Sequence, residues 1–392
     1  VLAVFVGALG FGARWGGPRA DRTGRPLLLY GLLELVAAVW AVLALFLAGL
    51  LLTPYAAIAG SLPGSLRFAL RVLLAALVVA PGAFALGATL PALVRHWVGA
   101  RVGATARGTA WVYGVNTLGA VAGALLSGVH GIEAYGVVGW LALAAGVGGA
   151  VGLVAALVGR RLAPLPRVEA VPTPSTLTER LPLAPALATA LACGALGLGI
   201  EVVGFRTLVF FVEGFTATFA AMLGVFILGL GLGSTLVGPW AVKTSRPDRR
   251  LLTLLVLLWA ATFFGSVFVL PGLEDLVREV RASAYAGTTG EAGIQAGLRH
   301  TALVGSAALL LLPAIILGAT FPLCVRWAEL AGLTPGAAVG RVYLFNSLGT
   351  LLAPLLVGFV LIPTLGITFT WTVLGHAAVL TALAVALQRR LG

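Results

Sequence analysis

The sequence predicts an all-α polytopic membrane protein, with about eleven transmembrane helices in two parallel, pseudo-symmetric repeats. Of the 392 residues, 60% are apolar and 10% are charged, whereas about a quarter of the residues of a soluble domain are charged. Nearly uncharged segments of roughly twenty or more residues recur along the whole chain, which is typical of transmembrane helices. Short sequence blocks also recur in the same order in both halves, which indicates an internal duplication.

The apolar segments have the length that a membrane crossing requires. A hydrocarbon core of about 30 Å needs roughly twenty residues at a rise of about 1.5 Å per residue. All the segments except the first reach that length, and we expect the first to be a truncated span. In chain order, the predicted spans cover residues 1–17, 28–52, 67–94, 107–129, 135–158, 184–210, 216–240, 251–272, 300–327, 339–361 and 366–388.

The basic residues predict how the spans are oriented. Most of the 25 Lys and Arg residues follow odd-numbered spans, and basic residues are retained on the cytoplasmic side of a membrane. We therefore expect the C-terminus in the cytoplasm and the protein in a bacterial cytoplasmic (inner) membrane. The net charge of +12 then reflects topology and attraction to anionic lipid headgroups, and no nucleic-acid partner is expected.

The duplication is clearest in two transmembrane segments that share a pattern. YGVNTLG begins at Tyr113 and YLFNSLG begins at Tyr343, so the tyrosine, the asparagine (Asn116 and Asn346) and the Leu-Gly pair all recur. Because the other recurrent blocks keep the same order, the chain contains two copies of one helical unit. In those blocks, LGATLP at 86–91 returns as LGATFP at 317–322, and Phe5, Gly10 and Gly12 return as Phe226, Gly231 and Gly233.

The repeats divide the chain into three parts. These are a first transmembrane repeat at 1–158, a Pro-rich cytoplasmic linker at 159–183 and a second transmembrane repeat at 184–392. Span 184–210 has no partner in the first repeat, so we expect that the first helix of that repeat is missing. Repeats with an even number of helices run parallel, and an axis along the membrane normal relates them.

The loop after the first span carries a recognisable motif. Its sequence, GGPRADRTGRPLLLYGLLEL at 16–35, resembles the signature loop between the second and third helices of the major facilitator superfamily. In that motif, a glycine permits close packing and an Asp-Arg pair with flanking arginines latches the cytoplasmic side. The resemblance implies a major-facilitator-like fold, with Gly17, Asp21, Arg22 and Arg25 as the latch.

A second resemblance covers essentially the whole chain. It rests on LYGLLEL with Glu34, on GATLP, on Y-x-x-N-[TS]-L-G, and on GIEVVGFR with Glu201 and Arg206. These stretches resemble the membrane region of spermidine synthase-like proteins, described as fused facilitator/spermidine synthase proteins. There, the membrane helices commonly precede a soluble aminopropyltransferase domain of Rossmann type. The resemblance implies a connection with polyamines, but this chain ends at LQRRLG without such a domain.

No catalytic site is predicted in the chain as given. The longest segments outside the predicted spans, 159–182 and 273–299, are too short for a Rossmann domain. No G-x-S-x-G, H-E-x-x-H or Walker sequence occurs, and these patterns would mark the commoner hydrolase and nucleotide sites. The four histidines and two cysteines form no spaced cluster. We therefore expect no enzyme activity, no cofactor and no metal site.

Polar side chains inside the predicted spans are the candidates for a substrate site. An ionised carboxylate at the bilayer centre costs about 2.5–3.5 kcal/mol or more, so the two acidic residues should face the bundle interior or water. For them, a cation or proton site between the halves and a buried group that locks helices together both remain open. For the Tyr-Asn pairs, helix packing is the stronger interpretation. The candidate set is Glu34, Glu201, Tyr113, Asn116, Tyr343 and Asn346.

The extracytoplasmic segment 273–299 carries its own pattern. Leu273, Leu276, Val277 and Val280 follow one another at helical spacing among charged residues. The pattern predicts a short amphipathic helix that lies on the membrane surface or contacts a protein partner.

Two functional interpretations follow from these patterns. The first is a protein of transporter-like architecture that handles polyamines or other organic cations. The alternative is a non-catalytic membrane anchor or subunit of a spermidine synthase-like protein or of a larger membrane complex. Fold similarity does not choose between them. Cation flux that falls when an intramembrane glutamate is replaced would favour the first, and stable copurification with a partner would favour the second.

Overall fold

The computed structural model describes the chain except residues 100–103, 169–181, 213–215, 242–248, 287–290 and 388–392. The described residues form helices joined by short connections, without a β-strand. The first repeat contains α1 (Leu2–Arg22), α2 (Pro26–Ala59), α3 (Gly64–Val98), α4 (Thr105–Leu126), the π-helix η1 (Ser127–Gly131) and α5 (Ile132–Arg161). The second contains α6 (Ala184–Phe211), α7 (Thr216–Ala241), α8 (Arg249–Tyr285), α9 (Glu291–Ser306), η2 (Ala307–Leu311), α10 (Leu312–Leu330), α11 (Pro335–Ala353), η3 (Pro354–Leu361) and α12 (Ile362–Leu387).

Each predicted span coincides with one helical stretch, once the π-helical segments are counted within the helices that they interrupt. Among the described residues, eight helical stretches are long and apolar enough to cross a membrane. The last of these, Pro335–Leu387, contains a break and accounts for two predicted spans. The prediction of an all-α polytopic membrane protein is therefore confirmed.

Two glycines at equivalent positions break the helical backbone. Gly136 has φ 66° and ψ 171° inside α5, and Gly366 has φ 76° and ψ 173° inside α12. Positive φ is strained for residues that carry a Cβ, so glycine suits both positions. Each break lies at a boundary between consecutive predicted spans, which explains how unbroken apolar sequence is divided into two helices.

Within each repeat, glycines bring the equivalent helices into close contact. A methyl group at Gly12 of α1 would overlap the carbonyl oxygen of Phe84 in α3, and a methyl group at Gly233 of α7 would overlap that of Ile315 in α10. Small residues let helix backbones approach in this way inside membranes. The α1–α3 and α7–α10 pairs are thus two copies of the same packing.

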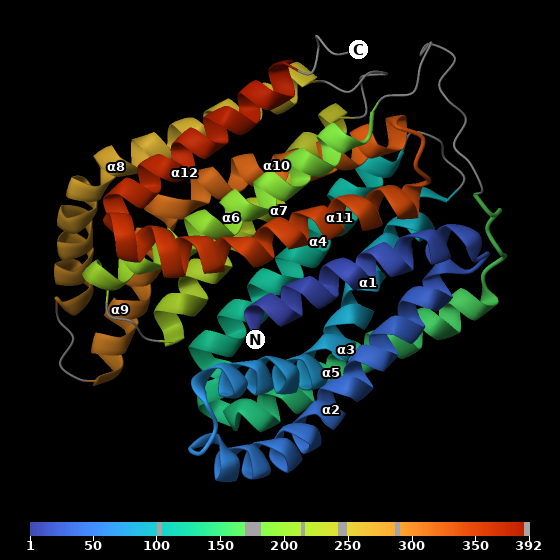
Figure 1. The fold of residues 1–392 in the computed structure, drawn as a ribbon, viewed down its shortest axis with the longest axis horizontal. Coiled ribbons are helices and arrows are strands. Elements are labelled where there is room, and N and C mark those ends of the chain that lie inside the picture. The colour runs from blue at the N-terminus through green and yellow to red at the C-terminus, as the bar shows by residue number, and fades with distance from the viewer. Residues whose placement is uncertain (100–103, 169–181, 213–215, 242–248, 287–290, 388–392) are drawn as a thin grey trace.

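The two repeats meet along two helix pairs, α1 with α11 and α4 with α7, which run through the middle of the bundle in Figure 1. A Cβ at Gly10 of α1 would lie 2.7 Å from the Cβ of Ser347 in α11. In the other pair, a Cβ at Gly231 of α7 would lie 3.2 Å from Cγ2 of Thr117 in α4. The interface between the repeats therefore has the same pseudo-symmetry as the sequence.

Segment 273–299 differs from the separate surface helix that its pattern predicts. Its first part continues α8, and Leu273 and Val277 are buried against Val212 and Ala302. The end of α6 and helix α9 supply these apolar neighbours, so the stripe packs inside the protein and does not lie on the membrane surface. A contact between this segment and a protein partner stays a prediction.

Candidate functional site

A cavity of about 200 Å³ lies between helices α4, α6, α7, α10 and α11. Four of these helices belong to the second repeat, and Tyr113 on α4 is the contribution of the first. Most of its wall is apolar or glycine, and its polar groups are few, as is usual for small-molecule sites. Besides Tyr113, the residues that line it include Cys193, Gly194, Gly197, Glu201, Phe226, Leu317, Thr320, Phe321, Asn346 and Thr350.

Glycines of α6 shape this cavity. A methyl group at Gly194 would overlap the backbone carbonyl of Asn346 on α11, and a Cβ at Gly197 would lie 2.6 Å from Cδ2 of Leu317 on α10. Helix α6 therefore touches both neighbours at its glycines. One turn beyond Gly197, the side chain of Glu201 lines the space that these contacts leave.

Glu201 is the acidic group of the cavity. It is partly buried in the middle part of α6, about 26 Å along the helix from Ala184 and about 15 Å from Phe211. No lysine, arginine or histidine of the described residues lines the cavity with it, and Arg206 on the next turns of the helix is exposed. A carboxylate so far from either helix end is costly unless it binds a cation or a proton. The cavity is therefore suited to a small positive group.

Aromatic rings close one side of the cavity. The ring of Tyr113 stacks on Phe321, with centroids 5.1 Å apart and an interplanar angle of 24°. Phe321 also contacts the ring of Tyr343 edge-on, with centroids 6.1 Å apart and an interplanar angle of 89°. The two equivalent tyrosines thus lie on one phenylalanine of α10, although only Tyr113 and Phe321 line the cavity.

The twin asparagines are placed differently. Asn346 lines the cavity, and its Nδ2 donates a hydrogen bond to the carbonyl oxygen of Ala190 in α6 at 3.2 Å. Asn116 is exposed on α4. Among the six candidate residues, the structure therefore gathers Glu201, Tyr113 and Asn346 around one cavity and leaves Asn116 outside it.

Glu34 also lies away from the cavity. It is a partly buried residue of α2, within hydrogen-bonding reach of Tyr30 one turn earlier. It faces α5, since a Cβ at Gly152 would lie 2.9 Å from the Cβ of Glu34. This position fits a group that holds α2 to α5, and a part in substrate binding stays a prediction.

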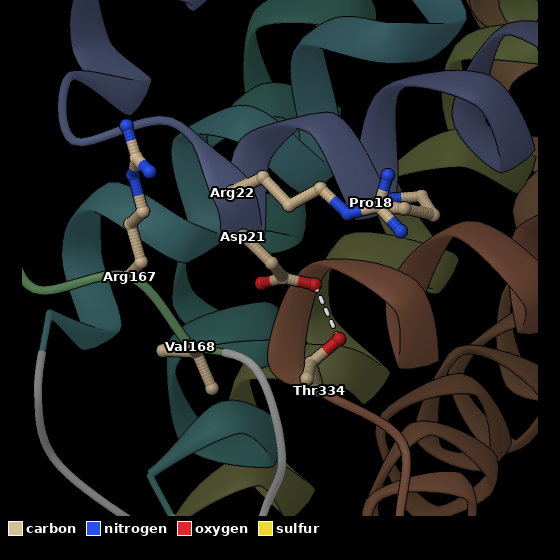
Figure 2. A pocket seen from close by; sticks show the side chains of 6 residues that line it. All are labelled: Pro18, Asp21, Arg22, Arg167, Val168 and Thr334. Carbon is tan, nitrogen blue, oxygen red and sulfur yellow. Dashed lines mark hydrogen bonds between the residues drawn. The ribbon is translucent and has the colours of Figure 1, made fainter.

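A second cluster joins the two repeats near the linker that connects them, at the end of the bundle that we call the linker end. Asp21, at the end of α1, is 2% exposed. Its carboxylate accepts hydrogen bonds from the Thr334 hydroxyl at 2.5 Å and from the backbone N–H groups of Gly336 and Ala337, both at 2.9 Å. Figure 2 shows Asp21 turned toward Thr334 across the pocket. A first-repeat carboxylate therefore caps the start of α11 in the second repeat.

The guanidinium of Arg95 connects this cap to the linker. Arg95 is fully buried, with Nε 3.7 Å from Oδ1 of Asp21. Its Nη1 donates to the carbonyl oxygen of Gly99 and its Nη2 donates to that of Pro166, both at 2.6 Å. The backbone N–H of Val168 also donates to the carbonyl oxygen of Asp21 at 3.2 Å. The start of the linker is therefore bound to the capped end of α1.

The remaining latch candidates have separate roles. A methyl group at Gly17 would overlap the carbonyl oxygen of Gly336, so Gly17 sets the close approach of α1 to α11. Arg22 is exposed and lines the pocket beside Asp21. Arg25 is exposed at the start of α2, where its backbone N–H donates to the hydroxyl of Thr23 at 3.2 Å.

A second carboxylate also joins the repeats, in this case from the second repeat to the first, and the sequence analysis missed it. Glu329 of α10 is 4% exposed. It accepts a hydrogen bond from the hydroxyl of Thr105 in α4 at 2.7 Å and pairs with Nη1 of Arg326 at 2.8 Å. Thr334 was missed as well, although Thr-Pro-Gly at 334–336 is a helix-start signal. That signal predicts the start of α11 but not the carboxylate from α1 that caps it.

Comparisons with known proteins support the fold. No protein-family model matches the sequence, and no curated protein is detectably similar to it. The human organic anion transporter MFSD10 (TETRAN) is similar in structure, with a TM-score of 0.53 at 13% identity over 98% of this chain and 82% of that chain. A variant of the Escherichia coli fucose:proton symporter FucP aligns over 98% and 96% of the two chains, with a TM-score of 0.49 at 14% identity. The chain thus has a major-facilitator-like fold, similar to that of MFSD10.

Proposed function

We propose that the protein is a membrane transporter that binds a small organic cation at Glu201. The observation that carries this proposal is the carboxylate itself, which lines a cavity formed by helices of the second repeat and by Tyr113 of the first, with no basic residue of the described chain beside it. The fold supports transport in general, because alternating access in this architecture moves the two repeats around a central site. The negative charge of the Glu201 carboxylate supports a cation as the substrate.

The size of the cavity limits the substrate. At about 200 Å³ it is smaller than the roughly 300–1,000 Å³ of drug-sized sites. One primary ammonium group with a short alkyl chain would fill it, with the ammonium at Glu201 and the chain against Phe226 and Leu317. The resemblance to spermidine synthase-like proteins favours a di- or polyamine, which would place one of its ammonium groups at Glu201. MFSD10 is described as an organic anion transporter, and the lone carboxylate here favours the opposite charge.

Uptake into proteoliposomes tests this function. The purified protein is reconstituted, and the entry of labelled putrescine, spermidine and a neutral sugar is compared. We expect saturable uptake of an amine, a reduction to background for Glu201→Gln, and near-normal uptake for the matched Glu34→Gln variant. Amine uptake that survives Glu201→Gln would contradict the proposal. Absence of any uptake, together with stable copurification of another protein, would favour a membrane anchor or complex subunit.

We also propose that the protein lies in a bacterial inner membrane with the linker end on the cytoplasmic side, because arginines of several loops lie at that end. Arg161→Cys, at the linker end of α5, and Ser283→Cys, in the distal part of α8, are both exposed positions. A membrane-impermeant maleimide added to intact cells should label Ser283→Cys and spare Arg161→Cys. The reverse pattern would invert the topology.

A further inference from the structure

A groove of about 680 Å³ opens at the linker end between α1, α3 and α11. It is separate from the cavity at Glu201. Its apolar part is formed by Phe11, Trp15 and Phe84, and its basic part by Arg14, Arg19, Arg22 and Arg341. Because α11 belongs to the second repeat, the groove spans the contact between the two repeats.

Along α1 the aromatic residues Phe11 and Trp15 come before Arg19 and Arg22, while Arg14 lies between the two aromatic residues and joins the basic part only through its long side chain. Phe11, Trp15, Pro18 and Arg22 are three or four residues apart and lie on one face of the helix. From Phe11 to Arg22 the helix rises about 16 Å, so the apolar part is deeper in the membrane and Arg22 is at the linker end. A ligand that fits must be apolar at one end and anionic at the other.

The apolar part of the groove faces outward. Phe11 and Trp15 are 55% and 36% exposed, and the Trp15 ring packs edge-on against Phe84, with centroids 5.5 Å apart. The guanidinium of Arg19 lies over the Trp15 ring, 4.0 Å from its centroid, so lipid chains would contact Phe11 and the part of Trp15 that Arg19 leaves uncovered. Trp15 lies near the linker end of α1, where tryptophan commonly anchors a helix at the membrane interface.

The positive charges of the groove lack acidic partners. Arg14 and Arg341 are both half-buried, and they lie on helices in close contact, because a Cβ at Gly340 would be 3.4 Å from the Cα of Arg14. Neither they nor Arg22 form an ion pair with a described residue, and Asp21 is buried and bound to α11 and Arg95. Half-buried cations at membrane depth require an anion or access to water.

We propose that this groove binds one anionic phospholipid. Its phosphate lies among Arg14, Arg22 and Arg341, and an acyl chain lies along Phe11, Trp15 and Phe84. Charge complementarity argues for the anionic headgroup, and the outward-facing aromatic floor argues for a lipid over free phosphate. A lipid in this position contacts both repeats beside the Asp21 cap. The proposal does not depend on whether the protein transports amines.

Quenching of Trp15 by brominated lipid tests this site. The purified full chain is mixed with phosphatidylglycerol or phosphatidylcholine that carries bromine on its acyl chains, and the Trp15→Phe variant is used to isolate the Trp15 signal. Brominated phosphatidylglycerol should quench Trp15 at concentrations where the zwitterionic lipid does not. Inorganic phosphate at the same ionic strength should fail to reverse the quenching.

Arginine variants decide whether the binding is local. In Arg14→Gln/Arg341→Gln, the apparent affinity for phosphatidylglycerol should fall about thirtyfold. The control Arg160→Gln/Arg161→Gln removes the same charge from exposed positions at the end of α5 and should change it little. Arg14→Lys/Arg341→Lys keeps the charge and should retain binding, and an unchanged unfolding temperature of the glutamine pair would show that its loss of binding is not misfolding.

Three results would overturn the site. These are equal quenching by both lipids, an equal loss of affinity in the two glutamine pairs, and release of the lipid by inorganic phosphate. The second would show diffuse attraction to the whole basic surface, and the third would show an anion site without a lipid.

Discussion

Helices α4 and α11 carry the same Tyr-x-x-Asn-x-Leu-Gly pattern, but among the described helices a neighbour packs on it only in α11. On α11, a methyl group at Gly349 would overlap the backbone of α6, and Asn346 donates a hydrogen bond to that helix. On α4, a Cβ at Gly119 would meet nothing within 4 Å, and Asn116 is exposed. The pattern is a helix-packing surface on α11, whereas none of the described helices covers the same surface of α4.

The contact between the repeats shows no such difference. Gly10 meets Ser347 across α1 and α11, and Gly231 meets Thr117 across α7 and α4. The asymmetry of the molecule is therefore concentrated at α6, which has no counterpart among the described helices of the first repeat. Because α6 also carries Glu201, the same helix that distinguishes the repeats supplies the charge of the cavity.

The largest expected difference between the twin helices concerns their glycines. Gly349→Leu should separate α11 from α6 and prevent assembly of a stable bundle, since overpacking at a backbone contact costs about 1–3 kcal/mol or more. Gly119→Leu should leave the protein folded. Thermal unfolding in detergent, followed through labelling of the two buried cysteines, Cys193 and Cys324, measures both. Equal damage in the two variants would show that a further helix packs on α4.

A smaller difference is expected between the two carboxylates that join the repeats, because both variants lose stability and only the excess of one loss over the other is compared. Asp21 makes three hydrogen bonds to the other repeat and Glu329 makes one. Asp21→Asn leaves Arg95 without its carboxylate, and removal of one partner of a buried pair costs about 3–5 kcal/mol. Glu329→Gln also removes an ion pair, with Arg326, but it keeps an acceptor for Thr105 and affects one hydrogen bond between the repeats where Asp21→Asn affects three, so it should cost less. The shift in unfolding temperature compares them, and a larger shift for Glu329→Gln would reverse the assignment of the main latch.

The smallest expected difference concerns the twin asparagines. Asn346→Ala removes an interhelical hydrogen bond, which is worth about 0.6–2 kcal/mol in membranes. Asn116→Ala removes an exposed amide and should leave the unfolding temperature unchanged. The same cysteine-labelling assay resolves the pair. A lower unfolding temperature for Asn116→Ala alone would mean that the amide has a partner beyond the described helices.

The sequence predicts the helices well because membrane crossing imposes a length and an apolar composition that can be read locally. The repeated blocks also predict the equivalent packing of α1 on α3 and of α7 on α10. The cavity could not be predicted, because its volume depends on how five helices pack together. The different placement of Asn116 and Asn346 could not be predicted either, because the two helices share a local sequence pattern but pack against different neighbours. The Asp21 cap joins residues from opposite ends of the chain, so local pattern suggests the aspartate but not its partner.

The central claim, that Glu201 is the cation-binding group, can be tested directly by chemical labelling. A hydrophobic carbodiimide modifies protonated carboxyl groups inside membranes, and peptide mass spectrometry measures the modified fraction of Glu201 and Glu34 in the same sample. The account predicts that spermidine or putrescine protects Glu201 and leaves the labelling of Glu34 unchanged. Labelling of Glu201 that is unaffected by any amine, or equal protection of both glutamates, would contradict it.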